Sequence, residues 1–263
     1  MISVLMGVRN AENTVERAVR SLRAPEGEEM EIICVDDAST DGTRDVLRRL
    51  EDDLGTVVAV RKERRGGLAA ALNEALSLSG GEWIARMDAD DVSQPDRLER
   101  ELAFLKENPG YGFVGCAVRL FDANGVYAKR SFPETPGKKD LVKGNPFIHP
   151  TLLFRRETLE RVGGYRSGET TMRCEDYELM FRLYAAEIRG YNLSETLLDY
   201  FEDRETVKHT RETRRNEMRV RKAGYRLIGV RGISRLQAYK PVLLGLLPRK
   251  AYRKLHRGKD GKL

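Results

Sequence analysis

The chain has 263 residues, of which 40% are hydrophobic and 33% charged, a composition typical of folded globular proteins and unlike that of disordered ones. No run of about 18 apolar residues occurs, so we expect no transmembrane helix, and the short apolar start lacks the basic lead of a signal peptide. The three scattered cysteines form no CxxC pair, which argues against a disulfide framework and favours a reducing compartment.

The net charge of +6 is divided unevenly along the chain. Residues 206–263 hold 18 Lys/Arg and 3 Asp/Glu, a net of +15, whereas residues 1–205 hold 29 and 38, a net of −9. Such a basic tail indicates attraction to a polyanion, either an anionic membrane surface or a nucleic acid. The alternative is a solvated helical face.

The first 110 residues alternate apolar strands with helices. We expect strands at 2–8, 31–35, 57–61 and 83–87. We expect helices from Asn10 or Asn13, as the cap, to about Leu22, from the turn at 36–43 to about Leu54, from Gly67 to about Leu78, and from Pro95 to about Asn108. Four such repeats predict a parallel sheet covered by helices on both faces.

The pattern changes after Pro109. Residues 113–121 and 126–130 predict a hairpin, 151–154 and 193–201 predict strands, and Cys174 leads into a helix with apolar side chains at helical spacing. The basic tail reads as helical, with a short apolar stretch at 242–247 beside a cationic cluster at 249–257.

Polar side chains follow three of the predicted parallel strands. They are Arg9 and Asn10, then Asp36 and Asp37, then Asp88, Asp90 and Asp91. Because parallel strands end at one edge of a sheet, where ligands of open α/β folds bind, these side chains should converge.

The three aspartates after the fourth strand repel one another unless a cation joins them, which favours a Mg²⁺ or Mn²⁺ site. The alternative is that Asp90, Asp91 or Ser93 caps the following helix. Asp36 and Asp37 either accept hydrogen bonds from a nucleoside or form a turn. Neither a GxGxxG nor a GxxxxGK[ST] motif occurs, so dinucleotide and P-loop interpretations lack support.

Six motifs occur in order along residues 1–201: RNAENTVERAVRSL, VDDASTDGT, GGLAAALNEAL, MDADD with QPDRLERE, HPTLLFRRE, and CEDYELMFRL. In this order and spacing they resemble the inverting family 2 glycosyltransferases. The resemblance implies an α/β GT-A fold with a mostly parallel central sheet flanked by helices, followed here by a helical basic C-terminal extension.

The resemblance also implies the residues of the site. Those expected to bind a nucleotide sugar are Val8, Arg9, Asn10, Asp36, Asp37, Gly67, Asp88, Ala89 and Asp90. Mn²⁺ or Mg²⁺ is expected on Asp90, with Asp88 and His149 as further metal candidates. Asp176 is the expected general base, with Glu175 as its catalytic neighbour. The alternatives are an acidic first turn complementing a helix dipole at 175–176, and a packed structural histidine at 149.

The sequence departs from the family pattern in three places. Arg64 and Arg65 stand where relatives often carry an asparagine, and YFEDRETVKH replaces a Tyr-Arg-x-His pattern, which involves Arg204 and His209. The QxxRW motif of processive synthases is absent, which favours the addition of one sugar per encounter.

The expected function is inverting, metal-dependent transfer of one sugar from a nucleotide sugar, a UDP-sugar above others, to a glycan or lipid-linked saccharide, as in bacterial surface polysaccharide synthesis. Residues 1–110 would bind the donor and 111–205 the acceptor, while the appendage 206–263 would attach the cytoplasmic protein to the inner face of the membrane, without binding nucleic acid. The alternatives are a nucleic-acid-binding protein using the tail, and a nucleotide-sugar-binding protein without catalysis.

Overall fold

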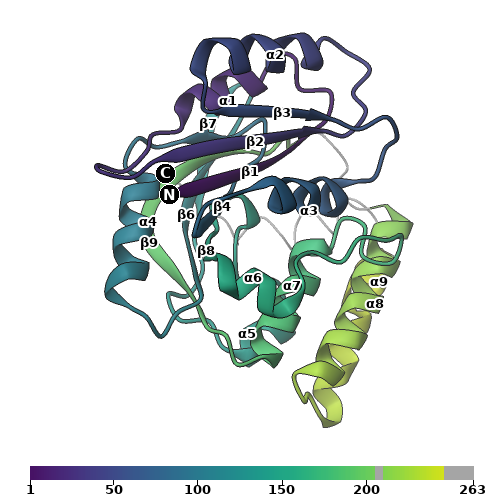
Figure 1. Cartoon of the computed structure of the whole chain (residues 1–263). Coiled ribbons are helices and arrows are strands. Elements are labelled where there is room, and N and C mark those ends of the chain that lie inside the picture. Colours follow the sequence, from purple (N-terminus) through teal and green to yellow (C-terminus); the bar gives the residue numbers. More distant parts are fainter. Residues whose placement is uncertain (205–209, 246–263) are drawn as a thin grey trace.

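A computed structural model describes residues 1–204 and 210–245 and shows one central sheet with helices on both faces (Figure 1). In this part of the chain the sheet has nine strands, in the order β3-β2-β1-β4-β8-β6-β9-β5, with β7 paired to β6. The strands are β1 (Ile2–Val8), β2 (Met30–Asp36), β3 (Val57–Arg61), β4 (Trp83–Arg86), β5 (Val92–Ser93), β6 (Phe113–Asp122), β7 (Gly125–Arg130), β8 (Leu153–Arg155) and β9 (Gly190–Phe201).

The N-terminal half of the sheet is parallel, as predicted: β1 pairs with β2 and β4, and β2 pairs with β3. Neighbouring residues of β1 pack into two different hydrophobic clusters. Met6 packs in a cluster with side chains of α1 (Val15–Ser21), α2 (Thr43–Leu54) and α4 (Arg97–Glu107), whereas Leu5 joins a cluster with α3 (Leu68–Leu78). Burial on both faces explains why these strands are apolar almost throughout.

The second half of the sheet is mixed. Strand β8 is antiparallel to β4 and β6, while β6 and β9 are parallel. The predicted hairpin forms as β6 and β7. Four short elements of the described chain were not predicted: β5, α5 (Lys138–Lys143), the 3-10 helix η1 (His149–Thr151) and α6 (Arg156–Val162).

The predicted cap of the first helix is wrong. The helix begins at Val15 with Thr14 at the N-cap, rather than directly after Asn10 or Asn13. Asn10 instead has a left-handed backbone, with φ of 49°, and its Oδ1 accepts a hydrogen bond from Thr40 N at 2.9 Å. The polar side chain therefore joins two loops instead of ending a helix.

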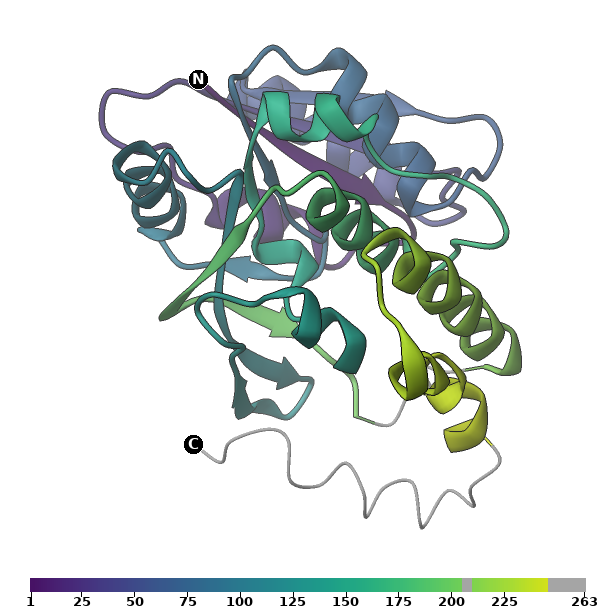
Figure 2. The ribbon, with the colours of Figure 1, turned by 90° about the horizontal axis from the view of Figure 1, so that it is seen from below.

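The tail is helical where it is described. It comprises α8 (Arg211–Leu227), the 3-10 helix η2 (Gly232–Tyr239) and α9 (Lys240–Gly245). These elements lie together beside the α5–α7 side of the molecule in both views (Figures 1 and 2). The rest of the predicted apolar stretch, the cationic cluster and His209 lie outside the described residues.

Close packing joins α8 to α7 (Glu175–Ala185). A Cβ on Gly224 would lie 2.2 Å from the ring of Phe181, so only glycine permits this approach. None of the described helices has both the length and the apolar character that a membrane span requires. All three cysteines are buried and free.

Candidate functional site

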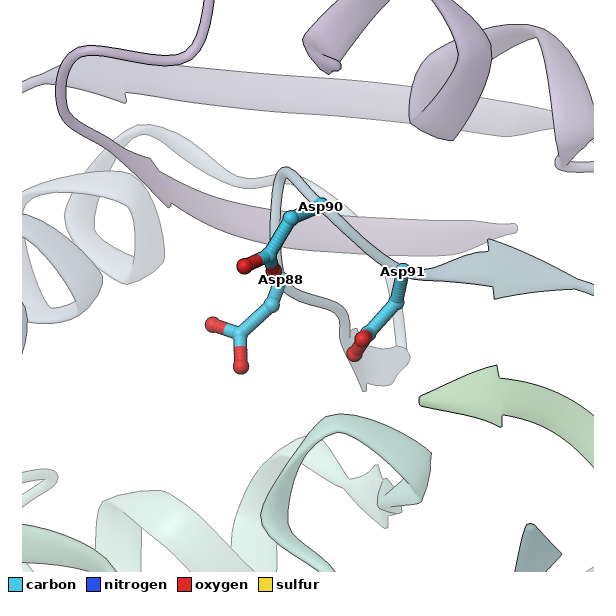
Figure 3. Close-up of side chains that lie close together, drawn as sticks. All are labelled: Asp88, Asp90 and Asp91. Atoms are coloured by element: carbon cyan, nitrogen blue, oxygen red, sulfur yellow. The ribbon is translucent and has the colours of Figure 1, made fainter. Parts of the chain in front are cut away.

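An acidic loop follows β4 at the carboxyl edge of the sheet. Asp88, Asp90 and Asp91 each bring one carboxylate oxygen within 4.8 Å of the other two. The three side chains extend to the same side of the loop (Figure 3). Carboxylate oxygens gathered in this way match the ligand preference of Mg²⁺ and Mn²⁺, so the residues present fit a divalent cation.

Asp91 lies at the bottom of this loop. Its Oδ1 accepts a hydrogen bond from Phe201 N at 2.8 Å, which ties the loop to β9, while its Oδ2 is buried without a hydrogen-bond partner among the described residues. Burial, together with the charges of Asp88 and Asp90, raises the pKa of Asp91 well above its usual value. A cation at the loop would relieve this repulsion.

The helix-cap interpretation of these aspartates is wrong. Helix α4 begins at Arg97 with Asp96 at its N-cap, and no side chain caps it. The loop is occupied with other contacts, because Asp91 binds β9 and Arg17 Nη2 donates to the Asp90 carbonyl at 3.4 Å.

A buried arginine lies beneath the acidic loop and was missed by the sequence analysis. Arg86, the last residue of β4, is 3% exposed, and its Nη2 lies 2.6 Å from Asp88 Oδ1. Its Nε and Nη1 are buried without a hydrogen-bond partner in the part of the chain that the structure describes. The available signal was a charged residue inside the apolar run WIARM. This ion pair engages one of the two carboxylate oxygens of Asp88.

The loops after β1 and β2 converge, as the strand-end argument predicts. Asp37 N donates to the Val8 carbonyl at 2.8 Å, and Arg9 Nη1 donates to the Asp37 carbonyl at 2.9 Å. Asn10 N donates to Ser39 Oγ at 2.9 Å. The two loops expected to surround a nucleobase are therefore joined by hydrogen bonds, and the acidic loop follows the neighbouring strand β4.

The carboxylate of Asp37 holds the glycine-rich loop. Its Oδ1 accepts from Gly66 N at 2.6 Å and its Oδ2 from Gly67 N at 2.8 Å. Gly67 has φ of +82°, a left-handed conformation that favours glycine at the start of α3. Each carboxylate oxygen can accept a second hydrogen bond, so this structural role does not conflict with the predicted contact to a base.

Asp36 has a turn-forming role as well. Its Oδ1 accepts from Ser39 N at 2.9 Å, as expected of an aspartate that stabilises a turn. Its Oδ2 is buried without a partner in the described chain. Ala89, between Asp88 and Asp90 in the acidic loop, is 8% exposed.

The predicted base and its neighbour open α7. Asp176 Oδ2 accepts from Asn145 Nδ2 at 2.8 Å, and burial raises the pKa of Asp176. Burial and the adjacent Asp176 charge raise the pKa of Glu175 from 4.5 to about 7. Both acids lie in the first turn, so they also complement the helix dipole, as the alternative interpretation requires.

One cavity of ≈ 670 Å³ brings the two chemical candidates together. Asp90 from the acidic loop and Asp176 from α7 both line it, although they are far apart in sequence. The other lining residues are Gly144, Asn145, Arg173, Cys174, Tyr177, Tyr200, Phe201, Asp203, Thr213, Glu217 and Arg221. The last three belong to α8, so the basic tail contributes to the site.

His149 is not brought to the aspartates. The metal-type cluster contains Asp88, Asp90 and Asp91, whereas His149 Nε2 pairs with the Tyr165 hydroxyl at 2.9 Å in a buried position. Burial and the nearby Arg86 charge lower the pKa of His149 well below its usual value, so the ring is neutral at pH 7. The contact is that of a packed polar residue.

Together, the parallel sheet, the acidic loop at its edge and the carboxylate across the cavity define the chain as a glycosyltransferase of the GT-A fold. The model of the family described as "Glycosyl transferase family 2" matches residues 3–163, more than half of the chain. The chain belongs to this family.

Relatives agree with this assignment. EpsE of Bacillus subtilis (strain 168), assigned as a glycosyltransferase, is 37% identical over 208 residues, which cover 79% of this chain and 75% of EpsE. The O-antigen biosynthesis glycosyltransferase WbnJ of Escherichia coli is 33% identical over 206 residues, covering 76% of this chain and 79% of WbnJ. Among solved structures, residues 1–349 of S. aureus TarS in complex with UDP-GlcNAc share the fold, with a TM-score of 0.70 at 18% identity over 97% of this chain and 75% of that TarS fragment.

The raised pKa of Glu175 predicts a pH-dependent stability. The folded state favours its protonated form, so this contribution is complete below about pH 4.5 and lost as the pH rises through about 7. Relative to Glu175→Gln, the wild type should lose up to ~3 kcal/mol of unfolding free energy between pH 4.5 and 8. Urea unfolding at both pH values measures this difference. Glu157→Gln, an exposed acid in the first turn of α6, is the control, and an equal pH dependence in both variants would contradict the shift.

Proposed function

We propose that the protein transfers one sugar, with inversion and with the help of a divalent metal, from a UDP-sugar to a saccharide or lipid-linked saccharide in bacterial polysaccharide synthesis. The observation that carries the proposal is the cavity lined by both Asp90 and Asp176. Relatives named for O-antigen and succinoglycan biosynthesis support the class of acceptor, and TarS bound to UDP-GlcNAc and to UDP supports the donor.

The acidic loop would hold the metal. Asp90 and Asp88 would bind Mn²⁺ or Mg²⁺, which acts as a Lewis acid that offsets the charge gained by the departing nucleoside diphosphate. Asp91 shapes the loop from below through its bond to Phe201 N. The connected loops around Val8 and Asp37 would bind the nucleoside.

Asp176 would activate the acceptor. A sugar hydroxyl is a poor nucleophile until a base removes its proton, and Asp176 can act as that base from the cavity wall. The Asn145 hydrogen bond favours the ionised carboxylate and fixes one of its oxygens. A single displacement with one base inverts the anomeric centre, whereas a retaining double displacement needs a second carboxylate as nucleophile.

Nucleotide binding tests the metal site. We expect one of UDP, GDP and dTDP, with UDP preferred, to bind in calorimetric titration with Mn²⁺, and binding to weaken at least tenfold without the metal or in Asp90→Ala. The control Asp96→Ala removes an exposed carboxylate that makes no capping hydrogen bond, although Asp96 occupies the N-cap position of α4. If the affinity for the nucleotide is the same without the metal and in Asp90→Ala, the metal site is refuted. Salt-dependent DNA binding without nucleotide binding would favour the nucleic-acid alternative.

Hydrolysis of the donor, with water in place of the acceptor, tests the base. Asp176→Asn should lower kcat about 10²- to 10⁴-fold without weakening UDP binding, because the amide cannot take a proton. The release of UDP is measured across pH, and the ionisation that limits the wild-type rate at low pH should disappear in the variant. Asp52→Asn on α2, an exposed position, is the control. An unchanged kcat in Asp176→Asn would exclude this residue as the base.

The tail would attach the enzyme to an anionic membrane at the inner face of the cytoplasmic membrane. On η2 and α9 the apolar side chains of Ile233, Leu236 and Leu243 are 82%, 62% and 60% exposed. Exposed Arg231, Arg235 and Lys240 lie beside them in sequence. Apolar side chains beside cationic ones on a short helical surface are typical of helices that lie in the headgroup region.

Vesicle binding tests this attachment. Deleting residues 232–263, or replacing Ile233 and Leu236 with Asp, should lower binding to phosphatidylglycerol vesicles about tenfold or more, because each buried apolar side chain contributes roughly 1.5–3 kcal/mol. Val126→Asp, on an exposed apolar residue of β7, should bind like the wild type. Sedimentation with vesicles measures the effect, and equal binding by the truncated chain would refute the proposal.

A further inference from the structure

The cavity is separate from most of the predicted donor site. Of the nine residues expected to bind the nucleotide sugar, only Asp90 lines it. Asp176, the proposed base, lines it too, and a base must touch the acceptor hydroxyl. The cavity contacts the acidic loop and the proposed base, but not the loops expected to bind the nucleoside. It is therefore the place where an acceptor sugar fits.

One face of α8 closes this space. Thr213, Glu217 and Arg221 line the cavity and follow one another at intervals of four residues, so they lie on one face of the helix. Arg221 is 5% exposed and donates to the Val142 carbonyl at 3.1 Å and to Glu217 Oε1 at 3.0 Å. The arginine therefore anchors the helix face and is itself occupied.

The same contacts connect α8 to the base. Arg221 Nη2 also donates to the Lys143 carbonyl at 3.4 Å, at the end of α5. Gly144 and Asn145 come next in the chain, and Asn145 donates to Asp176 Oδ2. The wall formed by α8 is thus held to the segment that orients the proposed base, and a ligand bound to the wall has a fixed relation to that carboxylate.

The lining favours a neutral sugar. Four carboxylates line the cavity against two guanidinium groups, and Arg221 is already paired with Glu217. Tyr177, Tyr200 and Phe201 supply aromatic rings. Carboxylates accept hydrogen bonds from hydroxyl groups and repel anions, so an acceptor unit bearing a phosphate or a uronic acid fits this lining poorly.

We propose that α8 forms one wall of the acceptor subsite, and that Glu217 binds the hydroxyl groups of a neutral acceptor sugar. Oε1 of Glu217 accepts from Arg221, whereas its Oε2 has no hydrogen-bond partner within residues 1–204 and 210–245. That oxygen is the one available to a sugar hydroxyl. The inference rests on the proposed function. It adds the chemical class of the acceptor, and it gives an acceptor-binding role to Glu217, which lies outside the segment that the family model matches.

Transfer to simple acceptors tests the subsite. The probes are the octyl glycosides of glucose, galactose and N-acetylglucosamine, with octyl glucuronide as the anionic comparison, and UDP-glucose, UDP-galactose and UDP-GlcNAc are the donors. We expect transfer to at least one neutral probe. Glu217→Gln replaces a carboxylate oxygen with an amide group that donates hydrogen bonds. This variant should raise the KM for the neutral acceptor probe about 10- to 100-fold. Glu212→Gln, which removes the same charge from the exposed first turn of α8, should leave the KM within about twofold.

Two further measurements keep the outcomes separate. Thr213→Val, on the same wall, should raise the KM about two- to tenfold even if Glu217→Gln proves unstable in thermal melting. Calorimetric binding of UDP with Mn²⁺ by the unaltered chain reports on the donor side. If UDP binds, the subsite is refuted by an unchanged KM in both wall variants, by transfer to octyl glucuronide alone, or by no transfer to any neutral probe. If no nucleotide binds, the proposed function itself fails.

Discussion

The ion pair between Arg86 and Asp88 lies at the centre of the site, and the other ionisable groups respond to it. Arg86 is the last residue of β4, whose other residues are buried and apolar. Its charge is therefore buried, where water screens it poorly. That charge opposes the rise in the pKa of Asp91 in the acidic loop and of Glu175 and Asp176 at the start of α7, and it helps to lower the pKa of His149. One buried cation thus links the two halves of the site electrostatically.

Hydrogen bonds to the main chain hold the loops that carry this chemistry. Asp37 fixes the two glycine amides before α3, Asp91 fixes the end of β9, and Arg221 fixes the end of α5. Each contact joins segments far apart in sequence. The loops lack regular structure of their own, so these side chains supply the order that a strand or helix would otherwise give.

Much of the fold was accessible from the sequence because its strands are buried on both faces and therefore uniformly apolar. The convergence of the loops that carry Asn10 and Asp37 followed from one rule, that parallel strands end at the same edge. The predicted cap at Asn10 failed because a hydrogen bond across loops replaced a local one. Strand β5 has two residues, too few to produce a period.

The site was harder to predict where it depends on tertiary contacts. A charged residue inside the run WIARM marks Arg86 as unusual, but nothing local shows that it pairs with Asp88, or that His149 pairs with Tyr165. The spacing of Thr213, Glu217 and Arg221 marks a helix face, but only packing against α7 makes that face part of a cavity. Sequence periodicity shows which residues share one face of a helix, but it does not show which element or cavity that face contacts.

The cavity wall has an evolutionary consequence. Only three of its thirteen lining residues, Asp90, Gly144 and Asn145, lie within the segment that the family model matches. The acidic loop therefore lies inside the matched segment, whereas the proposed base Asp176 and the α8 wall lie beyond it. Under the proposed function, substitutions of Thr213 or Glu217 on α8 would change the acceptor surface and leave the acidic loop and the nucleoside-binding loops intact, so a new glycan target would require changes in a single helix only.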